Sequence, residues 1–98
     1  MTHLSSTIKI GEARLKLHQL KSKWKIIDGQ KLQQDFIFEN FVEAMVFTNE
    51  IAALADDLGH YPHLKIHRQT VTVQLSTPAI KGLSEKDFIL ARKIETCC

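Results

Sequence analysis

The stretch that decides the fold is NFVEAMVFTNEIAALADDLG, residues 40–59. Its apolar side chains recur at helical spacing over about 18 residues, which predicts one long amphipathic helix. Asn40 followed by Glu43 is typical of a helix start, because an Asn side chain accepts a free backbone N–H there. Gly59 can take the left-handed conformation that ends a helix. The large side chains that we place in the core are Phe41, Met45 and Phe47.

Two strands are predicted directly after this helix. In residues 70–76, Val71, Val73 and Leu75 alternate with polar side chains, which is the period of a strand with one buried face. We expect residues 63–68 to form its antiparallel partner.

A hairpin and a helix are predicted before residue 40, and a last helix after residue 76. Asp28-Gly29 supplies a tight turn between residues 24–27 and 32–38. Apolar residues spaced i, i+4 and i+7 predict a helix over residues 11–21. In the last helix Ser84 and Asp87 form the start signal. Its core-facing residues are Phe88, Leu90, Ala91 and Ile94.

The predicted order is helix, strand, strand, helix, strand, strand, helix, which makes an α+β fold with a four-stranded antiparallel sheet covered on one face. We treat residues 1–98 as one domain, with residues 1–10 as a lead-in and residues 96–98 as a frayed tail. A four-stranded sheet has two edges, and an uncovered edge favours pairing with a second copy. We therefore expect a homo-oligomer, most simply a dimer.

Composition and charge favour a small cytoplasmic domain. A formal charge of +2 is too small to indicate nucleic acid, and we interpret the basic first quarter of the chain as a solvated face. The cysteines are adjacent, Cys97 and Cys98, so they cannot bridge the body of the domain. No signal pattern and no membrane-spanning apolar run is visible.

Three histidines surround a proline in GHYPHLKIH, residues 59–67, and they suggest either a metal site or an acid–base site. A zinc site is not favoured, because Pro62 disrupts a helix and, on a strand, Lys65 would lie between His63 and His67. Asp56 lies one helical turn before His60 and can orient its imidazole for proton transfer. A surface histidine at a helix end is the alternative.

The motifs DDLGHYPH and VTVQLSTPAIKGLSEKDFILARKIE resemble the pterin-4a-carbinolamine dehydratase family. Its signature has an acidic residue, then His-His-Pro, then a strand that ends in Leu-Ser/Thr-Thr-His, then Gly-Leu-Ser/Thr-x-x-Asp. The resemblance covers residues 11–95 and implies three helices on one face of the sheet, dimers or tetramers, and dehydration of 4a-hydroxytetrahydropterin. It implies no metal or other cofactor. One proton leaves a ring nitrogen and another reaches the departing hydroxyl in that reaction.

The resemblance is incomplete at the positions that carry the chemistry. Asp56, His60 and Pro62 match the signature, and Asp87 matches the acidic residue of the last helix. Tyr61 replaces the second histidine, Pro78 replaces the third, and Arg68 occupies an aromatic position. The resemblance implies catalytic positions at His60, Tyr61 and Asp56, and ligand-binding positions at Pro62, Pro78 and Asp87.

Two functional hypotheses follow. In the first, the chain has lost catalysis and binds proteins. The resemblance supplies precedents in a dimerisation cofactor for a homeodomain transcription factor and in Rubisco assembly chaperones encoded beside carboxysome genes. In the second, it is a weak dehydratase that still binds pterin, with His60 as acid or base.

Overall fold

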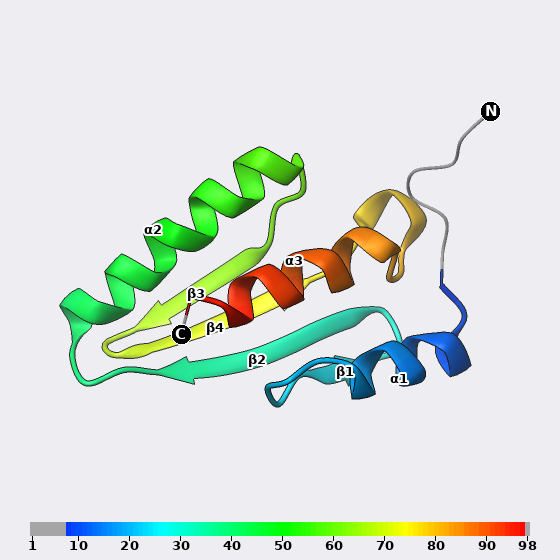
Figure 1. The fold of residues 1–98 in the computed structure, drawn as a ribbon, viewed down its shortest axis with the longest axis horizontal. Helices are drawn as coiled ribbons and strands as arrows, with labels where there is room; N and C mark the ends of the chain where they lie inside the picture. The colour runs from blue at the N-terminus through cyan, green and yellow to red at the C-terminus, as the bar shows by residue number, and fades with distance from the viewer. Residues whose placement is uncertain (1–7, 98) are drawn as a thin grey trace.

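Helices and strands follow one another in the order that the sequence predicts. The computed structural model describes residues 8–97 and contains one short 3-10 turn, η1 (Pro78–Ile80), besides the predicted elements. Those elements are α1 (Ile10–His18), β1 (Lys25–Ile27), β2 (Lys31–Ile37), α2 (Phe41–Leu58), β3 (His63–His67), β4 (Thr70–Leu75) and α3 (Glu85–Glu95). Figure 1 shows the extended sheet with the helices arranged along it. The predicted α+β class and element order are confirmed.

The four strands form one antiparallel sheet in the order β1-β2-β4-β3. Asp28 and Gly29 have φ values of 55° and 68°, so the predicted turn between β1 and β2 has the expected left-handed residues. The long central pairing joins β2 to β4, with Leu32 opposite Leu75 and Phe36 opposite Val71. β1 and β3 are therefore the two edges.

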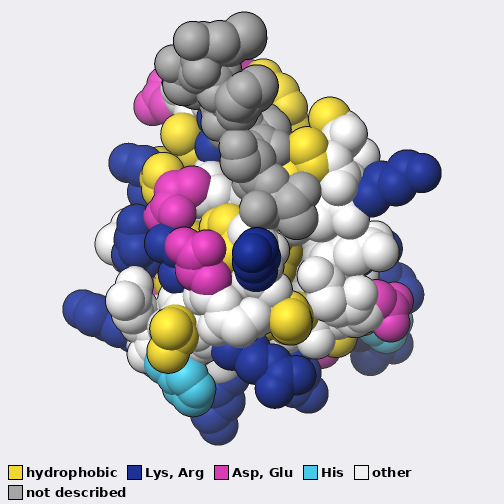
Figure 2. Space-filling view, turned by 90° about the vertical axis from the view of Figure 1, so that its right-hand side faces the viewer, with side chains coloured by type: hydrophobic (Ala, Val, Ile, Leu, Met, Phe, Trp, Pro, Cys, Tyr) yellow, Lys and Arg dark blue, Asp and Glu magenta, His cyan; other side chains and the backbone are white. Residues whose placement is uncertain are grey.

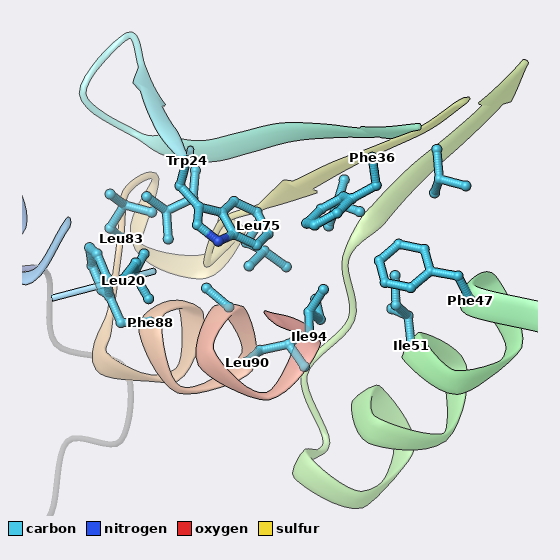
Figure 3. Close-up of a cluster of buried hydrophobic side chains, with 14 of the residues drawn as sticks. Leu20, Trp24, Phe36, Phe47, Ile51, Leu75, Leu83, Phe88, Leu90 and Ile94 are labelled. Atoms are coloured by element: carbon cyan, nitrogen blue, oxygen red, sulfur yellow. The ribbon is translucent and has the colours of Figure 1, made fainter. Parts of the chain in front are cut away.

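The hydrophobic core lies between one face of the sheet and the three helices. The strands contribute Leu32, Phe36, Val71, Val73 and Leu75, and the helices contribute Ala13, Ala44, Phe47, Ile51, Ala55, Phe88, Leu90, Ala91 and Ile94. Figure 3 shows Trp24, Phe36 and Phe47 pointing into this layer, with ring centroids 5.7 Å apart for the first pair and 4.8 Å for the second. All three helices thus cover the same face, as predicted.

Helix α2 has both of the predicted end signals. The Asn40 Oδ1 accepts a hydrogen bond from the Glu43 backbone N–H at 2.9 Å, and Gly59 takes a left-handed φ of 67°. Phe47 is buried and Met45 is half-buried, but the core prediction is wrong for Phe41, which is 56% exposed. Phe41 is the first helical residue, and it flanks the buried stripe instead of lying on it.

The two ends of the described chain pack against the core. Ile8, in the predicted lead-in, donates its backbone N–H to the Leu83 carbonyl oxygen at 2.8 Å. Cys97 also packs against the core, so the prediction of a frayed tail is wrong for this residue. Residues 1–7 and Cys98 lie outside the described residues. Among residues 8–97, no helix has the length and hydropathy needed to span a bilayer.

Candidate functional site

A buried polar cluster joins the end of α2 to the start of α3. The His60 Nε2 lies 2.6 Å from the Asp87 Oδ1, and the other oxygen of Asp87 accepts from the Thr77 hydroxyl at 2.9 Å. The hydroxyls of Thr77 and Ser84 are 2.7 Å apart. All four residues are buried, and the Asp87 side chain is inaccessible to solvent.

Local sequence signals place His60 and Asp87 in this cluster. Gly59 ends α2 in the left-handed conformation, and the next residue, His60, donates its backbone N–H to the Ala55 carbonyl oxygen at 3.1 Å. Asp87 is the third residue of α3, where its Oδ2 accepts from the Ser84 backbone N–H at 2.9 Å. One oxygen of Asp87 therefore caps the helix, and the other holds the imidazole.

The His60–Asp87 contact is a short hydrogen bond between two groups that have lost most of their water. A carboxylate has no proton to give, so the Nε2 of His60 carries the hydrogen and donates it. A buried carboxylate needs such a partner, because an unpaired charge in the interior is costly. Asp87 therefore fixes the orientation and the tautomer of the imidazole.

The second polar pair of the region is exposed. The Tyr61 hydroxyl donates to the Asp56 Oδ1 at 3.0 Å. The hydrogen bond to Asp56, the negative charge of that carboxylate and a small loss of water all raise the pKa of Tyr61 above its ordinary value of 10.0. At neutral pH the phenol is protonated, so it is a hydrogen-bond donor and not a base.

The structure pairs the predicted residues differently from the sequence hypothesis. We expected Asp56 to orient His60, but Asp56 contacts Tyr61, and the imidazole contacts Asp87. The reason is the left-handed Gly59, which turns the chain so that consecutive side chains point in different directions. Thr77 was missed, although a polar residue at the end of an apolar strand was a usable signal.

The remaining predicted residues are Pro62 and Pro78, which take no part in the hydrogen bonds of the buried cluster. Pro62 is half-buried in the connection to β3, and Pro78 is exposed at the start of η1. Pro78 lines a pocket of about 330 Å³, whereas His60, Tyr61 and Asp56 are not among its lining residues. The six predicted site residues thus divide into a buried pair, an exposed pair and two separate prolines.

The metal alternative finds no further support in the described part of the chain. Residues 8–97 contain no group of three His, Cys, Asp or Glu side chains placed to hold an ion. His63, Lys65 and His67 alternate along β3 and therefore share one face of the sheet, as the sequence indicates.

The fold and the buried histidine–aspartate pair define a class of small α+β domains in which two helix ends meet over the end of a sheet. A sequence model of the family described as pterin 4 alpha carbinolamine dehydratase matches residues 7–97. The chain belongs to this family. A protein of Alkaliphilus metalliredigens, provisionally named a pterin-4-alpha-carbinolamine dehydratase, is 39% identical over 84 residues, covering 86% of this chain and 76% of that protein.

Two solved structures share the fold. A transcriptional coactivator/pterin dehydratase from Brucella melitensis aligns with a TM-score of 0.88 and 28% identity, covering 94% of this chain and 98% of that one. A pterin dehydratase-like protein identified as a RuBisCO assembly factor in the alpha-carboxysome aligns with a TM-score of 0.64 and 17% identity, covering 82% and 92%. The second likeness concerns the fold alone.

Proposed function

We propose that this chain is a pterin dehydratase-like protein in which catalysis is slow or lost and whose main role is to bind another protein. The observation that carries the proposal is the state of the proton-transfer groups. His60 is the one imidazole left at the three histidine positions of the family signature, and it is buried against Asp87.

The dehydration needs two proton transfers, and this chain is poorly equipped for both. The Tyr61 phenol is protonated near neutral pH, since its ordinary pKa is 10.0 and Asp56 raises it further, so it cannot take up the ring proton. Pro78 has no titratable group. The loss of a positioned acid or base typically costs about 10²–10⁴ in rate, and the two substitutions fall on groups that act together.

A dehydratase of low activity is the second candidate, and one feature favours it. The His60–Asp87 pair retains an oriented imidazole whose other ring nitrogen is not used in that bond. The name carried by the Alkaliphilus relative points in the same direction. In this candidate His60 moves one proton, Tyr61 donates the other, and pterin binds without a metal or other cofactor.

A dehydration assay with 4a-hydroxytetrahydropterin separates the two candidates. We expect the wild-type chain to raise the rate little above the spontaneous one, and the Tyr61→His/Pro78→His variant to raise it by about 10²-fold or more. His67→Ala is the matched control, because this histidine lies on the sheet, outside the buried cluster and outside the pocket that Pro78 lines. Fast wild-type turnover that His60→Ala abolishes would establish the enzyme and end the protein-binding proposal.

Rubisco is the client protein that we propose to examine first. For this role we propose that the chain is located in the cytoplasm, in association with carboxysomes. The support is the fold shared with the assembly factor and the family precedent of dehydratase-like chaperones. Co-expression of this chain with Rubisco subunits should increase the amount of assembled Rubisco that is seen on native gels. No increase would exclude this client while leaving the slow-dehydratase proposal to the assay above.

A further inference from the structure

The sheet face that the helices leave uncovered is mainly polar and positively charged, with Ile27 and Ile37 as apolar exceptions. Strand alternation and register place lysines and histidines from three strands on this face, and one acidic residue among them. These residues are Lys25, Lys31, His63, Lys65, His67 and Asp35. Figure 2 views one end of the molecule, where Lys and Arg side chains project around the surface and hydrophobic surface is broken into separate patches.

One hollow of this face is large enough for a small molecule. It has a volume of about 330 Å³ and lies where the β1–β2 turn meets the loop that contains η1. Pockets that bind small molecules start at roughly this size. Its polar lining side chains come from both sides of the hollow and are Gln30, Lys31, His63, Gln74, Ser76 and Lys81.

The charge around the hollow is not neutralised by the protein. No Asp or Glu lines it. Among residues 8–97 the ion pairs join Lys16 to Glu85 and His60 to Asp87, so Lys31 and Lys81 have no carboxylate partner there. Asp35, the acid of the same face, accepts a hydrogen bond from the Thr72 hydroxyl at 2.6 Å and does not line the hollow.

The loop that carries Lys81 is held in place by backbone hydrogen bonds. The Thr77 N–H donates to the Gly82 carbonyl oxygen at 2.9 Å, and the Lys81 N–H donates to the Pro78 carbonyl oxygen at 3.1 Å. Lys81 has a left-handed φ of 52°, a conformation that favours Gly or Asn. A lysine kept in such a conformation beside an unneutralised hollow is the kind of local strain found at binding sites.

We propose that this pocket binds a small molecule that carries a phosphate group, with Lys31 and Lys81 as its two cationic contacts. A phosphate has several acceptor oxygens, and lysine ammonium groups bind it as point charges. Ser76, Gln30 and His63 supply further hydrogen-bond donors at the same hollow. The inference does not rest on the proposed function, although Pro78, a ligand-binding position implied by the family signature, also lines this pocket.

The test is a calorimetric titration of the full chain with pyrophosphate and with inorganic phosphate, at an ionic strength held constant with sodium chloride. We expect saturable binding of one pyrophosphate per chain. Lys31→Gln and Lys81→Gly should each weaken it by about tenfold or more, the loss typical of a charge-assisted contact. Lys81→Gly suits the left-handed backbone, so its folding should be unimpaired.

Lys25→Gln is the matched control, because Lys25 lies on the same face but lines a different hollow. Its affinity for pyrophosphate should equal that of the wild type. Three results would overturn the proposal: no saturable binding of either anion, an equal loss in Lys25→Gln, or tighter binding of an acidic peptide such as polyglutamate than of pyrophosphate. The second and third would mean a diffuse basic surface instead of a phosphate pocket.

Discussion

Asp87 is the residue on which the buried cluster depends. Its two oxygens take hydrogen bonds from the His60 imidazole, the Thr77 hydroxyl and the Ser84 backbone N–H. Removal of the carboxylate would leave all three donors buried without their acceptor. Leaving buried donors without their acceptor is among the more destabilising single changes in proteins.

We therefore expect Asp87→Ala to lower the free energy of unfolding by about 3–5 kcal/mol, measured by urea denaturation. Asp87→Asn should lose less, because its amide oxygen can still accept one of the bonds. Asp56→Ala is the control, since this carboxylate belongs to the exposed pair, and it should change stability little. Equal losses of unfolding free energy in Asp87→Ala and Asp56→Ala would show that the buried cluster contributes no more to stability than the exposed pair.

His60 and Asp87 could be singled out from the sequence, but the contact between them could not, and Thr77 was missed. A carboxylate one helical turn before His60 is a natural partner by spacing, and it proved to contact Tyr61 instead. The true partner, Asp87, is 27 residues further along the chain. That contact exists because the end of α2 and the start of α3 meet in space, which residue spacing cannot reveal.

At the scale of elements, α3 anchors the segment that follows α1. The Glu95 carboxylate accepts hydrogen bonds from the Ser22 backbone N–H at 2.7 Å, the Ser22 hydroxyl at 2.6 Å, the Lys21 N–H at 3.1 Å and the Trp24 Nε1 at 3.1 Å. Burial raises the pKa of Glu95, but the hydrogen bonds from Ser22, Lys21 and Trp24 together outweigh it, so that pKa lies below its ordinary value of 4.5.

This lowered pKa predicts a dependence of stability on acidic pH. The contribution of Glu95 is complete above its ordinary value and is lost as the pH falls through the lower pKa of the folded state. Unfolding free energies measured from about pH 6 down to about pH 3 should therefore fall less steeply for Glu95→Gln than for the wild type. Glu85→Gln, which removes an exposed ion pair with Lys16, should keep the wild-type slope. If the unfolding free energy of Glu95→Gln falls with pH as steeply as that of the wild type, the prediction is contradicted.

Elements with local signals were predicted well, and elements without them less well. Both ends of α2 and the start of α3 follow from caps that involve neighbouring residues, and the structure reproduces them. Helix α1 ends at His18 and not at residue 21, and Leu15 on it is 68% exposed. Its apolar pattern is weak, so tertiary packing decides its length.

At the scale of the whole molecule, strand order is the feature that the sequence leaves open. The pattern predicts two hairpins, but the central pairing of β2 with β4 joins segments on either side of α2. Such pairing depends on how the helices cover the sheet, which no local pattern encodes. It also leaves β1 and β3 as edge strands. Because an uncovered edge can pair with a second copy, self-association stays a prediction.

A second feature of the whole molecule supports self-association. The first turns of α2 expose a group of apolar side chains, with Phe41 56%, Val42 70% and Val46 55% exposed. Apolar side chains grouped in this way on a small domain usually mark a contact surface. We expect a homo-oligomer in which this part of α2 is covered by a second copy.

Light scattering after size exclusion should give a mass of at least twice the 11.2 kDa of one chain. Val46→Glu should reduce the mass to that of a single chain, because a charge on an apolar contact surface must be desolvated for the contact to form. Leu15→Glu is the matched control, as Leu15 is also an exposed apolar residue (68%) but lies on α1. If the Val46→Glu protein stays oligomeric, the contact lies elsewhere, most simply at the sheet edges. A monomeric wild type would contradict the prediction.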